Sequence, residues 1–141
     1  MKRGIWRMVV AGLVGFSLVA MAGCGSQGSA LDNIKKRGKL VVGVKADVVG
    51  FGYKNPDTNQ FEGLEIDIAK AIAKKILGDE NAIEFVPVTA KTRTGLLNNG
   101  EIDLVAATFT VTEERKKEVD FSPIYYEDGI QLLVMKDSGI L

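Results

Sequence analysis

The sequence contains no histidine among its 141 residues, and it contains only one cysteine. The absence of histidine excludes Ser-His-Asp and Cys-His catalysis and removes the commonest ligand of zinc. A single cysteine cannot form an intramolecular disulfide. We therefore expect no metal site, no cofactor and no histidine-based catalysis in this protein.

The body of the chain also lacks an excess of basic charge. The whole sequence has 18 basic and 18 acidic residues, but Lys2, Arg3 and Arg7 are the only charges before residue 24. Without these three, 15 basic residues face 18 acidic ones, a net charge of −3. Nucleic-acid binding needs a clustered basic face, so we expect no nucleic-acid partner. The hydrophobic content of 46% is typical of a single folded domain.

The chain has no apolar run long enough to span a bilayer easily. Residues 1–7 are basic, and residues 8–22 are apolar or small. A bilayer span needs about 20 apolar residues, so this pattern predicts a cleaved signal peptide over residues 1–23. A permanent N-terminal anchor helix is the alternative.

The single cysteine, Cys24, follows directly after this segment. Residues 19–24, VAMAGC, resemble a bacterial lipobox, with Met21 where leucine is usual. The resemblance implies cleavage before Cys24, acylation of that residue with palmitate, and a lipid-anchored, extracytoplasmic protein. Residues 24–30 are then expected to form a flexible tether. A plain secreted or anchored protein is the alternative.

Residues 31–141 alternate between strand and helix patterns. Strands are predicted at 39–45, 82–88, 102–107 and 130–135, with helices at 31–37, 64–77, 92–98 and 112–119 and a loop at 47–60. This order predicts an α/β fold with a mostly parallel sheet flanked by helices on both faces. In the helix at 64–77, the apolar side that is expected to be buried comprises Leu64, Ile68, Ala71, Ile72 and Ile76.

The loops at the carboxyl ends of the strands are the expected ligand-binding edge of such a sheet. Thr108 and Thr110 follow one strand, Thr112 is placed to cap the next helix, and Arg115 lies one turn into it. Hydroxyls, free amides and a guanidinium together suit a carboxylate. The alternative is a capped surface helix in which Arg115 pairs with a neighbouring glutamate.

Two more cations lie near the same edge. Lys45 ends the first strand and Arg93 follows the second, which would suit a ligand with a second acidic group. Each could instead be an ordinary surface residue. Phe51 and Tyr53 are candidates for an apolar wall, although aromatic residues more often pack in a core.

No pair of carboxylates is placed for acid–base catalysis. Glu65 and Asp67 are expected on different sides of one helix, and Asp103 and Asp120 are interpreted as caps or ion-pair partners. The tyrosines at 125–126 are interpreted as packing residues. We therefore expect a binding protein and not an enzyme.

Four stretches then carry a family resemblance. "LVVGVKADVVGFGY", "GLEIDIAKAIAKKI", "EFVPVTAKTRTGLLNNGEIDLVAATFTVTEERKKEVDFSPIYY" and "GIQLLVMKDS" resemble, in this order, the polar amino-acid solute-binding proteins of ABC importers, family 3. The resemblance covers nearly all of residues 35–138. It implies a periplasmic-binding-protein-like fold of type II, in which two lobes close on an amino acid and deliver it to ABC permease subunits.

The resemblance also implies roles for single residues. Thr110 and Arg115 would hold the ligand α-carboxylate, assisted by the backbone near Thr108. The carbonyl of Ala107 or the hydroxyl of Thr108 would receive the ligand ammonium group.

The expected ligand follows from two further positions. Lys45 and Arg93 match cations of the members that bind acidic amino acids, so glutamate or aspartate is favoured and glutamine is possible. An aromatic residue that stacks on the ligand in glutamine-type members is absent, because Val48 and Ala90 stand in the matching places.

Members of this family are about twice as long, so the resemblance implies that residues 31–141 form the N-terminal lobe, ending at the hinge strand, with the second lobe absent. Val49 stands where proline is common. We expect weak or no ligand binding by this chain alone, because half of the contacts would be missing. The alternatives are a dehydratase-like enzyme, a sensory input domain and a fragment without function.

Overall fold

The structure is a computed structural model that describes residues 28–139. The predicted signal peptide and Cys24 lie outside the described residues. Helix α2 (Ala30–Arg37) begins within the segment predicted as a tether. Ser29 caps it, because its hydroxyl accepts the Asp32 amide at 3.2 Å while the Asp32 carboxylate accepts the Ser29 amide at 3.1 Å. No helix in the described residues has the length and apolar character of a membrane span.

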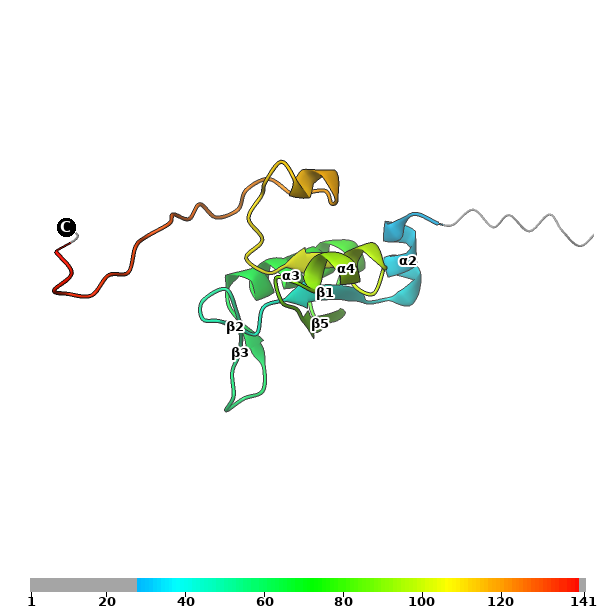
Figure 1. The fold of residues 1–141 in the computed structure, drawn as a ribbon. Coiled ribbons are helices and arrows are strands. Elements are labelled where there is room, and N and C mark those ends of the chain that lie inside the picture. Colours follow the sequence, from blue (N-terminus) through cyan, green and yellow to red (C-terminus); the bar gives the residue numbers. More distant parts are fainter. Residues whose placement is uncertain (1–27, 140–141) are drawn as a thin grey trace, which may run out of the picture. The chain divides into compact units, whose positions relative to one another are not determined.

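A parallel three-stranded sheet lies at the centre of the part from Gly38 onward (Figure 1). Its order is β5-β1-β6, with β1 (Leu40–Val44) between β5 (Ile83–Pro87) and β6 (Leu104–Ala106). Leu40 pairs with Ile83, and Val42 pairs with Leu104. Because β1 is covered on both sides, its sequence LVVGV is apolar without alternation. The prediction of an α/β fold with a parallel sheet is confirmed.

Two helices cover the sheet. Helix α3 (Leu64–Leu77) packs on β1 and β6, and helix α4 (Arg93–Asn98) packs on β6. The core includes Leu40, Val42 and Val44 of β1, which are 2%, 0% and 0% exposed. A second cluster joins residues of the strand ends to α4: Val88, Ile102 and Ala107, with Val41, Val86, Leu96, Leu97 and Val105 packed against them.

The buried side of α3 differs from the predicted side. Its bounds agree with the prediction, but the fully buried residues are Glu65, Ile66, Ala69 and Ala73, whereas Leu64 and Ala71 are exposed. The prediction placed the most bulky residues inward. The buried side is centred one position away, on Ile66, Ala69 and Ala73, so Ile68, Ile72 and Ile76 lie half-buried at its border.

The segment predicted as a loop at 47–60 is partly strand. It forms an antiparallel sheet of order β2-β3-β4, from β2 (Asp47–Val48), β3 (Gly52–Lys54) and β4 (Phe61–Glu62). Two-residue and three-residue strands are too short to show a period-two pattern, so these segments carry no strand signal.

Two other predicted elements are wrong in this structure. The predicted helix at 112–119 is a single 3₁₀ turn, Arg115–Lys117, with the Thr112 hydroxyl accepting the Arg115 amide at 3.3 Å. The predicted strand at 130–135 is not a strand, and its apolar side chains are exposed except Val134, which is half-buried. A strand needs a partner for its backbone groups, and no strand of the described residues pairs with this segment.

Candidate functional site

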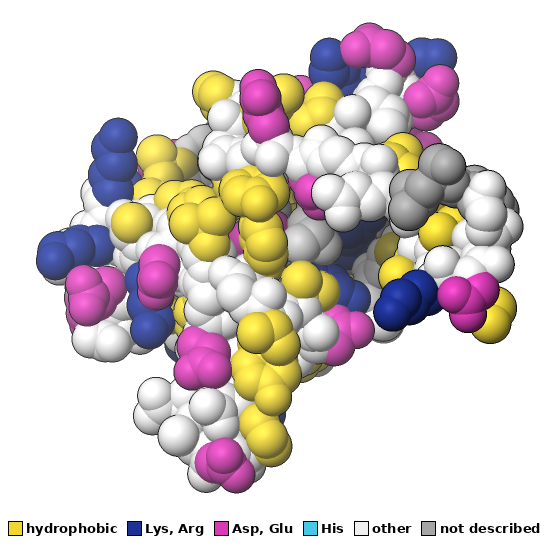
Figure 2. Space-filling view, turned by 90° about the vertical axis from the view of Figure 1, so that its left-hand side faces the viewer, with side chains coloured by type: hydrophobic (Ala, Val, Ile, Leu, Met, Phe, Trp, Pro, Cys, Tyr) yellow, Lys and Arg dark blue, Asp and Glu magenta, His cyan; other side chains and the backbone are white. Residues whose placement is uncertain are grey.

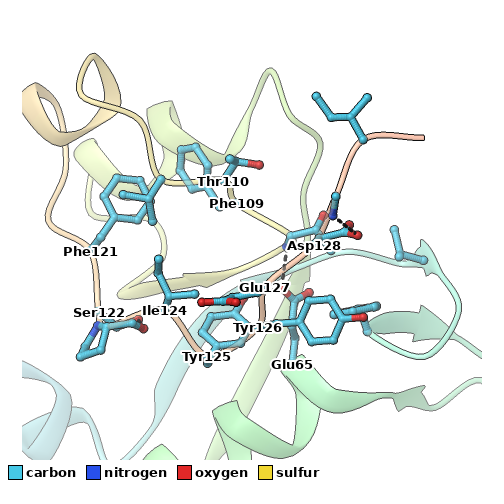
Figure 3. A pocket seen from close by; sticks show the side chains of 17 residues that line it. Glu65, Phe109, Thr110, Phe121, Ser122, Ile124, Tyr125, Tyr126, Glu127 and Asp128 are labelled. Atoms are coloured by element: carbon cyan, nitrogen blue, oxygen red, sulfur yellow. Dashed lines mark hydrogen bonds between the residues drawn. The ribbon is translucent and has the colours of Figure 1, made fainter. Parts of the chain in front are cut away.

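A cavity of about 790 Å³ lies beyond the carboxyl end of β6. Two parts of the chain form most of its wall: the loop at 108–111 that follows β6, and the extended segment at 121–130. Glu65 of α3, with Val48 and Phe51 of the β2–β3 region, completes it. Figure 3 shows Phe109 and Phe121 together at one wall and Tyr125 beside Glu65 at another. The cavity therefore lies at the sheet edge where the sequence predicted a ligand site.

Two of the predicted site residues line this cavity. Thr108 and Thr110 are both exposed side chains in its wall. Arg115 lies beside them, because its Nη1 donates to the Thr110 carbonyl at 2.7 Å. Arg115 thus reaches back over the loop, as the sequence suggested. The alternative was an ion pair between Arg115 and a neighbouring glutamate. Among the described residues, the ion pair in this turn instead joins Lys116 and Glu113, at 2.8 Å.

Arg93 lies behind the loop and not in the cavity wall. It is 6% exposed, and its Nη1 donates to the Ala107 carbonyl at 2.7 Å. Its guanidinium also stacks over the Phe109 ring at 3.7 Å, with Arg115 over the same ring at 4.9 Å. Burial, and then the nearby charge of Arg115, lower the pKa of Arg93, while the charge of Glu65 opposes this. An arginine stays protonated at neutral pH, so this is a buried positive charge.

Lys45 and Ala107 also lie outside the cavity wall. The Lys45 ammonium forms an ion pair with Asp47 at 2.9 Å, and this pair lowers the pKa of the exposed Asp47 carboxyl. Ala107 is fully buried, and its carbonyl is the one that accepts from Arg93. Both cations predicted to face an acidic ligand therefore have partners within the chain.

Glu65 is the residue that the sequence interpretation missed. It is 0% exposed, and its Oε1 accepts both the Thr108 amide and the Tyr125 hydroxyl at 2.6 Å (Figure 3). Its position four and eight residues before Ala69 and Ala73 places it on the side of α3 that is buried. That spacing to two small residues is the sequence signal for the burial of Glu65. It runs against the usual preference of glutamate, which is rarely buried.

Aromatic residues of the extended segment were expected only to pack, and they do pack against the cavity wall. Phe121 contacts Phe109 with ring centroids 5.2 Å apart, and Tyr126 contacts Phe51 at 4.8 Å, both edge to face. With the Tyr125–Glu65 hydrogen bond, these contacts fix the segment at three points. Phe51 thus lines the cavity as the sequence suggested, whereas Tyr53 is in β3, paired with Asp47 and Glu62.

The carboxylate Asp103 has a structural role. Its Oδ2 accepts the Val41 amide at 2.8 Å, and its own amide donates to the Val41 carbonyl at 2.8 Å. These bonds join β1 to the start of β6. Among residues 28–139, no cluster of three or more potential ligands could hold a metal ion.

Comparison with known proteins identifies the family. The chain matches the model of the bacterial extracellular solute-binding proteins, family 3, over residues 40–140. Since this match covers more than half of the sequence, the chain belongs to this family, and the solute-binding resemblance noted in the sequence is confirmed.

Two curated relatives are named for glutamine. The chain is 50% identical to the glutamine-binding protein of Geobacillus stearothermophilus, over 99% of this chain and 61% of that protein. It is 52% identical to the ABC transporter glutamine-binding protein GlnH of Bacillus subtilis, over 89% of this chain and 50% of that protein. The chain thus spans about half the length of the curated relatives it matches.

A solved structure of a single domain is also similar. The arginine-bound form of domain 1 from TmArgBP, a point mutant, is 36% identical with a TM-score of 0.64, and the match covers 70% of this chain and 74% of that domain. This agreement shows the type II periplasmic-binding-protein fold of one lobe.

Proposed function

We propose that this chain carries the first lobe of an extracytoplasmic amino-acid-binding protein of an ABC importer. The observation that carries the proposal is the loop after β6, where Thr108 and Thr110 line the cavity and Arg115 folds over them. Family membership and the names of the two glutamine-binding relatives support a role in binding and not in catalysis. Residues 31–141 would be the lobe, with the ABC permease subunits as partners.

The ligand α-carboxylate would lie against Thr110 and Arg115. The Arg115 guanidinium donates through Nη1 to the Thr110 carbonyl, and it has further N–H groups that a carboxylate can use. The ligand ammonium group would lie at the Thr108 hydroxyl, because the other candidate, the Ala107 carbonyl, is fully buried and already accepts from Arg93.

We favour glutamine as the ligand over glutamate and aspartate. The preference for an acidic ligand depends on Lys45 and Arg93 being available to the ligand. In the structure Lys45 pairs with Asp47, and Arg93 donates to the Ala107 carbonyl. An uncharged side-chain amide needs no further cation. The two relatives named for glutamine support this choice, and the acidic ligands remain the second candidates in the same experiment.

The experiment is an amide NMR titration of the chain with L-glutamine, L-glutamate, L-aspartate and L-arginine. We expect shifts at Thr108, Thr110 and Arg115 that saturate only at millimolar L-glutamine, since one lobe supplies part of the contacts and cannot exclude water from the ion pair. The arginine-bound domain 1 of TmArgBP supports binding to a single lobe. Arg115→Lys, which keeps the charge but loses the planar fork, should weaken binding about tenfold.

Four outcomes would change the proposal. Stronger binding of L-glutamate or L-aspartate would restore the acidic ligand. Shifts that avoid the loop after β6 would overturn the site, and no response to any of the four amino acids would overturn binding by this lobe. Micromolar affinity would overturn the expectation of weak binding.

We also propose that Cys24 is lipidated, which would hold the lobe at the outer face of the cell membrane. The support is the sequence of residues 19–24 alone. Labelling cells with a radioactive fatty acid tests it: the chain should carry label and Cys24→Ser should carry none, and equal labelling would refute the proposal.

A further inference from the structure

Thr108 has a backbone conformation that costs free energy. Its φ is 46°, in the left-handed region, and apart from glycines only Asn59 shares a positive φ among the described residues. Asparagine adopts this region with little strain, but a β-branched residue such as threonine does so rarely. Such a conformation persists only where surrounding contacts impose it. The contacts around Thr108 should therefore explain it.

Two buried charges hold the peptide group that precedes Thr108. Its amide donates to Glu65 Oε1 at 2.6 Å, a short charge-assisted bond. The carbonyl before it, that of Ala107, accepts from Arg93 Nη1 at 2.7 Å, and the Thr108 carbonyl lies 3.5 Å from the same nitrogen. An anion and a cation thus bind the two ends of one peptide group, Ala107–Thr108, and the same cation lies near the carbonyl of the next peptide group.

Both charges are buried. Glu65 is 0% exposed and Arg93 is 6% exposed, although Glu65 contributes to the cavity wall. Glu65 Oε2 and Arg93 Nε are buried without a hydrogen-bond partner among the described residues. The negative charge of Glu65 acts on Arg93 in the direction that favours its protonated form, so the two buried charges partly offset each other. Arg93 lies outside the cavity wall, and Glu65 Oε1 already accepts the Thr108 amide and the Tyr125 hydroxyl, so both side chains act on the position of the loop.

We propose that Glu65 is a positioning residue of the binding site: with Arg93 as its countercharge, it holds Thr108 in the left-handed conformation that turns the Thr108–Thr110 loop toward the cavity. The consequence for ligand affinity rests on the proposed function, whereas the consequence for the Thr108 backbone does not. Tyr125, which donates to the same Glu65 oxygen, ties the opposite cavity wall to this anchor.

Three substitutions of Glu65 separate its properties. Glu65→Ala removes the acceptor and the charge. Glu65→Asp keeps the charge but shortens the side chain by one methylene, so that its oxygens fall short of the Thr108 amide. Glu65→Gln keeps the length and one acceptor oxygen. Asp67→Asn is the matched control, because it makes an acid-to-amide change in the same turn of α3 at an exposed position.

The measurement uses the full chain labelled with ¹⁵N and ¹³C. The Thr108 amide proton shift reports its hydrogen bond, and the Thr108 Cα and Cβ shifts with the amide–Hα coupling report φ. We expect Glu65→Ala and Glu65→Asp to move all of these signals, Glu65→Gln to restore them, and Asp67→Asn to leave them unchanged. The L-glutamine affinity of folded protein should fall about tenfold or more in Glu65→Ala and Glu65→Asp and recover in Glu65→Gln, as expected for a lost hydrogen bond at a positioned group.

Several results would overturn the proposal. One is a folded Glu65→Ala chain with wild-type Thr108 signals. If Glu65→Ala does not fold, Glu65→Asp and Glu65→Gln decide, and Glu65→Asp matching the wild-type signals would refute the proposal. Unchanged L-glutamine affinity with reduced stability would mean that Glu65 is only structural. If the wild-type chain binds none of the four amino acids, the proposed function fails, while the Thr108 signals still decide whether Glu65 fixes the loop.

Discussion

Tyr125 shows how one hydrogen bond makes stability depend on pH. Folding raises the pKa of its hydroxyl, first because burial penalises the phenolate and second because the hydroxyl donates to Glu65. The folded pKa therefore lies above the unfolded value near 10. Stability from this bond is fully present below about pH 10, and it is lost as the pH rises through the folded pKa.

The corresponding prediction concerns Tyr125→Phe. We expect it to lower the free energy of unfolding at neutral pH by about 1 kcal/mol, a modest loss because Tyr125 is 48% exposed. Ultraviolet absorbance of tyrosinate during an alkaline titration should lose its latest phase in Tyr125→Phe. Tyr126→Phe is the control, since it keeps the ring that contacts Phe51 and leaves the Glu65 bond intact. A late phase that survives in Tyr125→Phe would contradict this assignment.

At the scale of elements, helix α3 is the part that connects the sheet to the site. Its first turn is bonded to the turn after β2, because the amides of Leu64 and Glu65 donate to the carbonyls of Gly50 and Phe51 at 2.9 and 3.0 Å. Glycines flank both ends, Gly63 with φ 121° and Gly78 with φ 82°. The start of α3 therefore sets the position of Glu65.

We predict that these two glycines respond differently to alanine. At Gly63 a Cβ would lie 2.4 Å from the Phe51 carbonyl oxygen, so Gly63→Ala should destabilise the fold by about 3 kcal/mol or more. At Gly78 a Cβ meets nothing within 4 Å, so Gly78→Ala should cost only the left-handed strain, about 1 kcal/mol. Urea unfolding of both variants measures the difference, and equal losses would show that the contact with Phe51 is easily relieved.

The elements that were predicted well are those whose sequence pattern is contained in a short, continuous stretch of the chain. The bounds of α3 follow from its helical spacing and from Gly78, and β1 follows from an unbroken apolar run. The short strands β2 and β4 carry no such signal. The burial of Glu65 could not be read from local pattern, because its two partners, Thr108 and Tyr125, are 43 and 60 residues away along the chain.

The short range of sequence signals also explains which site residues could be predicted and which could not. Thr108, Thr110 and Arg115 were found because they are neighbours in sequence, and the turn brings Arg115 back to the Thr110 carbonyl. Lys45 and Arg93 were expected in the site because they follow strands that end at one edge. Their actual partners, Asp47 and the Ala107 carbonyl, depend on side-chain directions that strand order does not determine.

At the scale of the whole molecule, the segment from Ile124 to Met135 presents unusual apolar exposure. Ile130 and Leu133 are fully exposed, and Leu132 and Met135 are 84% and 83% exposed. Figure 2 shows apolar side chains on the surface among charged ones. Exposed apolar surface of this kind promotes association.

We therefore predict that the chain self-associates as its concentration rises, and that Leu133→Lys reduces this association by about tenfold or more in the association constant. Gln131→Lys is the matched control, because it adds the same charge at a neighbouring exposed position without removing apolar surface. Sedimentation velocity over a range of concentrations measures the effect. If both variants behave alike, charge and not apolar contact governs the association.

The place of β1 in the centre of the sheet has a consequence for biosynthesis. A ribosome completes β1 long before either of its neighbours, since β5 begins at Ile83 and β6 at Leu104. During that interval the nascent chain carries an apolar strand with both edges open, which is a ready target for chaperones and for aggregation. The sheet can close only after residue 106 has left the exit tunnel, so the order of its strands delays folding of the sheet until residues beyond β6 have been translated.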